Sequence, residues 1–119
     1  MSGVKRAAVV AAAAGLGLTL TPGMAQAASA SCYVSVGSSS CSSGSIPADA
    51  AEHYIYFSVR GGLTCAQADF RIIDSTNGAI VYSRHVGAGV ASGYVRGLYA
   101  SYYLRVINSC GGGGGKIEN

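Results

Sequence analysis

Residues 53–60 read HYIYFSVR, and their side chains alternate between apolar and more polar character. Ile55, Phe57 and Val59 occupy one set of alternate positions, and tyrosine, serine and arginine occupy the other. Successive side chains of a β-strand point to opposite faces, and β-branched and aromatic residues are enriched in strands. The stretch therefore predicts a half-buried strand over 53–60, ended by two glycines.

Residues 68–86 predict a β-hairpin. Over 68–74, Phe70 and Ile72 would share one face, with Asp69, Arg71 and Ile73 on the other. The turn sequence STNG at 75–78 contains Asn-Gly, a pair that tolerates positive φ and suits a tight turn. The stretch 79–86, AIVYSRHV, then predicts the returning strand.

Three more stretches complete the predicted sheet structure. Residues 32–36 predict a short strand, and residues 90–96 a weak or bulged one, because Gly93 interrupts the pattern. Residues 99–108 alternate strongly and predict the last strand, with Leu104 on one face and Tyr103 and Arg105 on the other. Since no stretch has a helical period, we expect an all-β fold, a small antiparallel β-sandwich or barrel of five or six strands.

The segments on either side of residues 53–110, the predicted β-domain core, have a different composition. Residues 28–52 are rich in serine and alanine and contain the run SSSCSSGS at 38–45. Such a segment buries little apolar area, so it is predicted to be loop-like apart from its one short strand. Residues 111–119 begin with five glycines, and this composition predicts a flexible tail.

The first 27 residues have the pattern of a secretory signal peptide. Lys5 and Arg6 precede an uncharged apolar run over 7–20, and Ala25-Gln26-Ala27 ends it with small residues. An apolar run of this length is shorter than the ~20 residues that a transmembrane helix needs. We expect cleavage at about residue 27, with Ala28-Ser29-Ala30 as a second possible cut, followed by export of the mature chain and no membrane association after cleavage.

Removing the signal peptide changes the charge balance. The full chain carries a net charge of +3, and loss of Lys5 and Arg6 lowers it to +1. A nearly neutral domain lacks the basic surface that binds nucleic acids or anionic membranes. The sequence therefore argues against both partners.

All four cysteines lie in the mature chain, separated by 9, 24 and 45 residues. An even number in an exported protein indicates two disulfides, whereas zinc sites usually contain C-x-x-C pairs. The predicted strand positions favour Cys65–Cys110, which would attach the last strand to the middle of the sheet. Cys32–Cys41 would then close the serine-rich loop. Two other pairings remain open at this point.

No residue pattern indicates catalysis, a cofactor or a metal. The two histidines, His53 and His85, fall in predicted strands, and no G-x-S-x-G motif marks a nucleophilic serine. The five acidic residues offer no selected pair for glycoside hydrolysis. We therefore expect a protein that is not an enzyme.

Tyrosine is the dominant aromatic residue, with eight tyrosines, two phenylalanines and no tryptophan. Tyrosine and arginine are enriched at protein interfaces because they bury a large amphipathic surface. The residues predicted to bind a partner lie on the polar faces of two strands: Tyr54, Tyr56, Arg60, Tyr103 and Arg105. Neighbouring strands could gather them into one patch. Alternatively, tyrosine serves here only as a sheet former, or exposed tyrosines stack on sugar rings.

The signal peptide and the Ala/Ser/Gly-rich start of the mature chain resemble the small secreted proteins of filamentous actinobacteria. Families with this layout include proteinaceous amylase inhibitors and the small adaptor subunit of umbrella toxin particles. The amylase inhibitors carry an exposed Trp-Arg-Tyr loop, and the absence of tryptophan argues against that family. The chain is similar to the adaptor in size, export and predicted fold.

These observations lead to one functional expectation and one alternative. The resemblance implies a secreted, non-enzymatic module that binds another secreted protein, as an adaptor in an extracellular, toxin-associated assembly or as an inhibitor. The alternative is a module that binds carbohydrate or cell wall. We expect no cofactor in either case.

Overall fold

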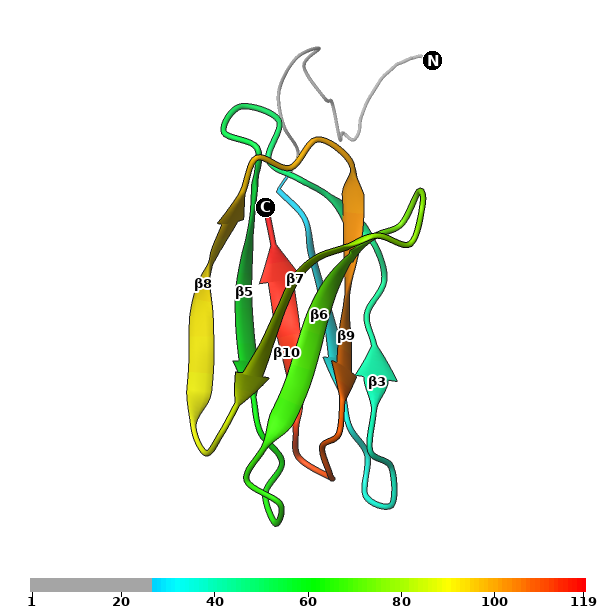
Figure 1. Ribbon diagram of the computed structural model, residues 1–119, viewed down its shortest axis with the longest axis vertical. Coiled ribbons are helices and arrows are strands. Elements are labelled where there is room, and N and C mark those ends of the chain that lie inside the picture. Colours follow the sequence, from blue (N-terminus) through cyan, green and yellow to red (C-terminus); the bar gives the residue numbers. More distant parts are fainter. Residues whose placement is uncertain (1–26) are drawn as a thin grey trace, which may run out of the picture.

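A computed structural model describes residues 27–119, which form two antiparallel β-sheets packed face to face (Figure 1). The described residues include no helix. The predicted all-β sandwich with two disulfides is therefore confirmed, and the barrel alternative is not adopted. The predicted signal peptide lies outside the described residues except for Ala27.

The first sheet has the strand order β2-β10-β5-β8, and the second has the order β3-β9-β6-β7, with the short β4 also paired to β9. The first sheet contains β2 (Ser29–Tyr33), β5 (Tyr54–Arg60), β8 (Val90–Arg96) and β10 (Gly114–Glu118). The second contains β3 (Cys41–Ser42), β4 (Ile46–Pro47), β6 (Ala68–Asp74), β7 (Ile80–Val86) and β9 (Ser101–Ile107).

The strands predicted from strict alternation form within one or two residues of their expected bounds. β6 and β7 make the expected hairpin, and Gly78 in its turn has a φ of +77°. The Asp74 N–H donates to the Ala79 carbonyl at 2.8 Å and closes the turn. The alternating faces are also as predicted, since Ile55 and Val59 are fully buried between the sheets.

The core lies between the sheets, where the alternate apolar positions of both meet. Phe57 from the first sheet contacts Phe70 from the second, with ring centroids 5.0 Å apart. Tyr82 of β7 packs on the same pair, 5.3 Å from Phe57. The ring cluster therefore joins β5 of the first sheet to β6 and β7 of the second.

The expectation that residues 28–52 are mostly loop is wrong in part. The predicted strand 32–36 forms three residues earlier along the chain, as β2, and pairs with β10. β3 and β4 add two short edge segments to β9. Val34 and Ile46 are buried in the core, so a segment of low apolar content still supplies two anchoring side chains.

The glycine-rich end is not a flexible tail. Residues 114–118 form β10, a central strand paired with both β2 and β5, and Ile117 is fully buried. The Asn119 side-chain oxygen accepts a hydrogen bond from the Ala28 N–H at 2.8 Å. A run of glycines suggests mobility in an isolated chain, but here Gly112 and Gly114 have φ of +92° and +149°, which favour glycine over other residues. The glycines are required by a tight backbone path.

β8 is also more regular than its sequence predicts. All seven of its residues pair in unbroken register with β5, so Gly93 causes no bulge. A Cβ at Gly93 would lie 3.2 Å from the ring of Phe57, which explains why a small residue occupies this inward position. Glycine here makes room for a neighbouring ring.

The favoured disulfide pairing is confirmed. Cys32–Cys41 joins the edge strand β2 to the edge strand β3, and therefore one sheet to the other. Cys65–Cys110 joins the loop after β5 to the end of β9. No free cysteine remains among the described residues.

Candidate binding faces of the sandwich

Three tyrosines and one arginine cluster on the outer face of the first sheet, and we call Tyr54, Tyr56, Tyr94 and Arg96 the tyrosine face. Tyr94 is its centre, because its ring lies 5.1 Å from the Tyr54 ring and 5.0 Å from the Tyr56 ring. The strand register explains the cluster, since Tyr54 pairs with Arg96 and Tyr56 pairs with Tyr94. Side chains directly opposite in a sheet contact each other.

Arg96 completes this cluster from its edge. Its guanidinium carbon lies 5.1 Å from the centroid of the Tyr94 ring and 5.9 Å from that of Tyr54. Such cation–π contacts hold an arginine in place while leaving its N–H groups free to donate. Partial desolvation, and after it the Asp49 carboxylate, raises the pKa of the Tyr54 hydroxyl. The face therefore presents tyrosine hydroxyls beside the Arg96 cation.

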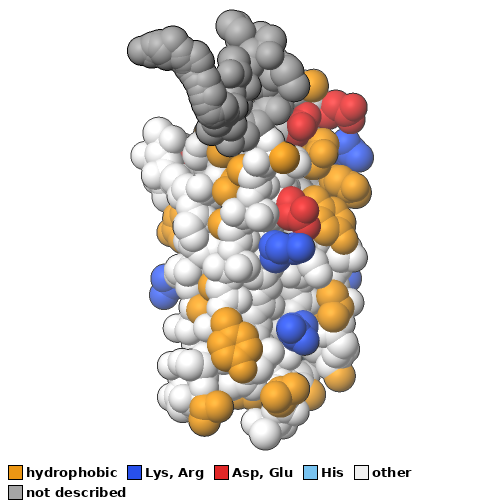
Figure 2. Space-filling model, turned by 180° about the vertical axis from the view of Figure 1, so that it is seen from behind, with side chains coloured by type: hydrophobic (Ala, Val, Ile, Leu, Met, Phe, Trp, Pro, Cys, Tyr) orange, Lys and Arg blue, Asp and Glu red, His pale blue; other side chains and the backbone are white. Residues whose placement is uncertain are grey.

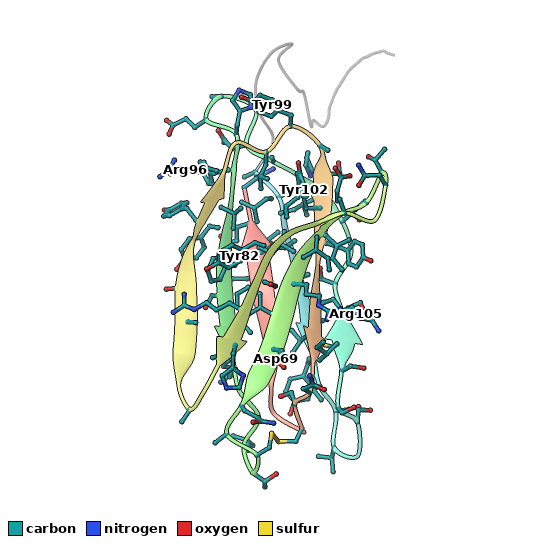
Figure 3. The ribbon with its side chains drawn as sticks, in the orientation of Figure 1. Asp69, Tyr82, Arg96, Tyr99, Tyr102 and Arg105 are labelled. Carbon is teal, nitrogen blue, oxygen red and sulfur yellow. A yellow bond between two sulfur atoms is a disulfide. The ribbon has the colours of Figure 1, made fainter. Side chains whose placement is uncertain are left out.

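The structure separates the five residues predicted to bind a partner. Tyr54, Tyr56 and Arg60 lie on the outer side of β5, in the first sheet. Tyr103 and Arg105 lie on the outer side of β9, in the second sheet, so they face the opposite direction. Figure 3 shows Arg96 beside β8 and Arg105 beside β9, on different sides of the molecule. The expectation of a single patch is therefore wrong.

Sequence reasoning missed Tyr94 and Arg96. Both follow Gly93, a residue that indicates an irregular strand, so the outward positions of 90–96 do not stand out in the sequence. The signal was present in the alternation of 90–96, VASGYVR, in which the outward positions are valine, serine, tyrosine and arginine. Tyr94 is 54% exposed, the most exposed of the three tyrosines in the cluster.

An open groove of about 710 Å³ crosses the other end of the same outer face. Tyr33 and Val90 flank it, Ser31 and Ser58 line it, and the main chain at 113–115 contributes to it. Arg60 and Lys116 add positive charge, and Lys116 is paired with Glu118 at 3.1 Å. Figure 2, seen from behind, shows hydrophobic and basic side chains and a few acidic ones spread over this side among uncharged surface.

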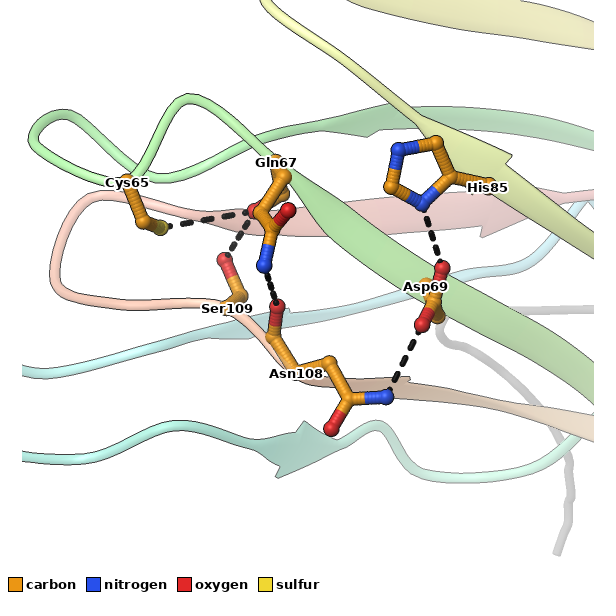
Figure 4. A network of polar contacts seen from close by, with 6 residues as sticks. All are labelled: Cys65, Gln67, Asp69, His85, Asn108 and Ser109. Carbon is orange, nitrogen blue, oxygen red and sulfur yellow. Dashed lines mark hydrogen bonds and ion pairs between the residues drawn. The ribbon is translucent and has the colours of Figure 1, made fainter.

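A polar network occupies the outer face of the second sheet, near the Cys65–Cys110 disulfide (Figure 4). Asp69 Oδ1 lies 2.7 Å from His85 Nδ1, and the Asn108 side-chain amide donates to Asp69 Oδ2 at 2.8 Å. These hydrogen bonds, with that of Asn108 the stronger influence, lower the pKa of the Asp69 carboxyl below 3.8. The network ties β6 to β7 and to the end of β9.

The Asp69–His85 pair has the geometry with which an acid orients a catalytic base. A nucleophile must also contact the base, and within residues 27–119 the one side-chain hydrogen bond of His85 goes to Asp69. The same residues contain no group of three or more side chains able to hold a metal ion. The pair is explained by its role in joining β6 to β7.

No family model, curated protein or solved structure matches the chain significantly. Within the described residues, no helix is long and apolar enough to cross a membrane. The two disulfides are consistent with an extracellular or other oxidising environment.

Proposed function

We propose that the mature chain is a secreted, non-enzymatic module that binds another secreted protein and uses the tyrosine face as its main interface. The observation that carries this proposal is the packing of Tyr54, Tyr56 and Tyr94 around one another with Arg96 held over two of the rings. Tyrosine and arginine dominate the residues whose loss weakens protein complexes most. A cluster already ordered in the free protein loses little conformational entropy on binding.

The neighbouring edge strand supports a protein partner over other ligands. β8 is the last strand of the first sheet, so one side of its main chain has no strand partner within residues 27–119. It contains no proline, and no charged side chain points inward from it, although these features commonly protect an edge. An extended segment of a partner can add to β8 by main-chain hydrogen bonds while its side chains meet Tyr94.

The scaffold is suited to a rigid adaptor or inhibitor. Two disulfides and the pairing of β10 with both β2 and β5 fix the ends of the described chain within the sandwich. A rigid body of this kind, exported by the predicted signal peptide, fits one subunit of an extracellular, toxin-associated assembly. It predicts stoichiometric binding without turnover.

The alternative of a glycan-binding module is favoured by a different observation, the groove flanked by Tyr33. Aromatic rings stack on sugar faces, and serine hydroxyls and the cations Arg60 and Lys116 would contact hydroxyl or carboxylate groups of a saccharide. The groove is open, its lining is partly polar and partly apolar, and it lies at the far end of β5 from Tyr54. Substitution of Tyr33 therefore separates this alternative from the protein-binding proposal.

Affinity capture of the tagged mature protein from its native culture fluid, followed by mass spectrometry, tests the proposal. We expect one or two secreted proteins in fixed ratio with wild type and with the Tyr33→Ser variant. Recovery of the bare domain, together with Tyr33-dependent retention on glycans or whole cells, would contradict protein binding and support the alternative.

A further inference from the structure

A row of four side chains crosses the outer face of the second sheet, opposite the tyrosine face. Ser42 of β3 is in register with Arg105 of β9, Arg105 with Arg71 of β6, and Arg71 with Ser83 of β7. Because residues in register on one face are neighbours, the order across the sheet is Ser-Arg-Arg-Ser. We call these four residues the arginine row.

The two arginines at the centre of the row are like charges placed directly opposite each other, an arrangement that destabilises a sheet. Neither forms an ion pair with a carboxylate within the described residues, where the ion pairs are His85–Asp69 and Lys116–Glu118. Asp69 lies two residues before Arg71 on β6, and its oxygens are already bound by His85 and Asn108. Arg105 Nη1 has only a 3.4 Å contact to Ser42 Oγ. Their N–H donors are therefore available to an outside anion.

The rows on either side of the arginine row limit what that anion can be. Tyr103 and Ile73 form the next row on one side, and Ile107 and Asp69 form the next row on the other. Positive charge is thus confined to one line, with apolar side chains above it and an apolar and an acidic side chain below. A polyanion, whose charges repeat along its length, would place further negative groups on Ile73 or Asp69.

We propose that the arginine row is a second binding surface, which receives one carboxylate of an acidic side chain flanked by apolar residues on a partner protein. A guanidinium binds a carboxylate through two parallel N–H···O contacts, and Arg71 and Arg105 can share its two oxygens. Tyr103 and Ile107 contact the apolar neighbours of that acid. With the tyrosine face on the other sheet, the domain has two chemically different surfaces pointing in opposite directions, although this second site does not depend on the first.

The arginine Nε–Hε signals in ¹⁵N–¹H NMR spectra of the mature, disulfide-bonded protein report directly on this site. The probe is the blocked peptide Leu-Glu-Leu, titrated in parallel with Leu-Gln-Leu. We expect saturable shifts of the Arg71 and Arg105 signals with the glutamate peptide and none with the glutamine peptide. Arg105→Gln should weaken binding of the glutamate peptide by about tenfold or more, as expected for a charge-assisted contact.

Two control variants distinguish the site from a general effect of charge. Arg84→Gln removes the same charge from β7 at a position in register with Phe70, so peptide affinity should stay at the wild-type value. Tyr56→Ser with Tyr94→Ser should also leave it unchanged, because those residues lie on the other sheet. Arg105→Gln should melt no lower than wild type, since it relieves a repulsion; a purely structural arginine would give a lower Tm.

Three results would overturn the proposal. The first is the absence of saturable Arg71 and Arg105 shifts with the glutamate peptide. The second is an equal response to the glutamine peptide. The third is tighter binding of a heparin tetrasaccharide than of the glutamate peptide, which would indicate a polyanion instead of an acidic protein segment.

Discussion

Gly115 of β10 and Val59 of β5 are paired across the first sheet, and a Cβ on Gly115 would lie 2.8 Å from Val59 Cγ2. The same Cβ would lie 3.0 Å from Leu104 Cδ2 of the facing sheet. The absence of a side chain at Gly115 therefore allows the two sheets to approach at the centre of the core. The close approach of the two sheets, more than the conformational freedom of glycine, explains why residue 115 is a glycine.

Gly115→Ala should destabilise the fold. Extra atoms in a packed core cost about 1–3 kcal/mol, and β10 cannot move away without losing its pairing on both sides. Gly44→Ala is the control, because a Cβ there meets nothing within 4 Å, and its effect should stay within about 0.5 kcal/mol. Urea unfolding of the oxidised proteins measures both values. Equal stability of the two variants would show that the 111–115 run is not tightly packed.

Ile117→Ala tests whether the C-terminal strand belongs to the core. Ile117 is fully buried, and removing a buried isoleucine side chain to the β-carbon costs about 2–5 kcal/mol. Ile80→Ala in β7 is a matched control, since that isoleucine is 53% exposed and should contribute far less. Thermal unfolding should give a much lower Tm for Ile117→Ala. A wild-type Tm would mean that the C-terminal segment is detached in solution.

The two disulfides should contribute unequally to stability. Cys65–Cys110 closes a loop with a sequence separation of 45, and Cys32–Cys41 one with a separation of 9. In the chain-entropy model, their removal costs about 4 and about 2.5 kcal/mol, respectively. Chemical unfolding of the two paired Cys→Ser variants should follow that order. The reverse order would indicate that the Cys32–Cys41 disulfide, which links β2 to β3, stabilises the folded protein directly and not mainly by restricting the unfolded chain.

Asp69 should make stability depend on acid pH. Its pKa is lowered in the folded protein, chiefly by the hydrogen bond from Asn108 and then by that from His85. A lowered folded pKa means that the contribution is present above the unfolded pKa of about 4 and is lost as pH falls through the folded value. Asn108→Ala should raise the Asp69 pKa toward its ordinary value in a ¹³C-carboxyl NMR titration. An unchanged pKa would contradict the network drawn in Figure 4.

Alternation of side chains was sufficient to predict most of the fold, because burial on one face of a strand is a local property of sequence. It gave β5, the β6–β7 hairpin and β9, and cysteine positions beside those strands favoured the observed disulfides. The glycine run at 111–115 was wrongly predicted to be flexible. Glycine is found both in mobile segments and where the backbone packs too closely for a side chain, so the sequence does not distinguish the two cases. Only the tertiary neighbours of Gly115 decide between them.

The candidate site was less predictable, for a related reason. Alternation shows that Tyr56 and Tyr103 both point away from the core, but not that β5 and β9 belong to different sheets. That assignment depends on pairing between distant segments, including the insertion of β10 between β2 and β5. Likewise, Tyr94 joins Tyr56 only because β8 pairs with β5 in one particular register.

The most direct test of the proposed function is the affinity of the partner, once captured, for two single tyrosine variants. Tyr94→Ser removes the centre of the tyrosine face, and Tyr33→Ser removes an exposed tyrosine from the groove at the far end of the same sheet. Isothermal titration calorimetry should show binding about thirtyfold weaker for Tyr94→Ser, as for an interface residue worth about 2 kcal/mol, and unchanged for Tyr33→Ser. Wild-type affinity for Tyr94→Ser with a loss for Tyr33→Ser would contradict the account and place the main interface at the groove.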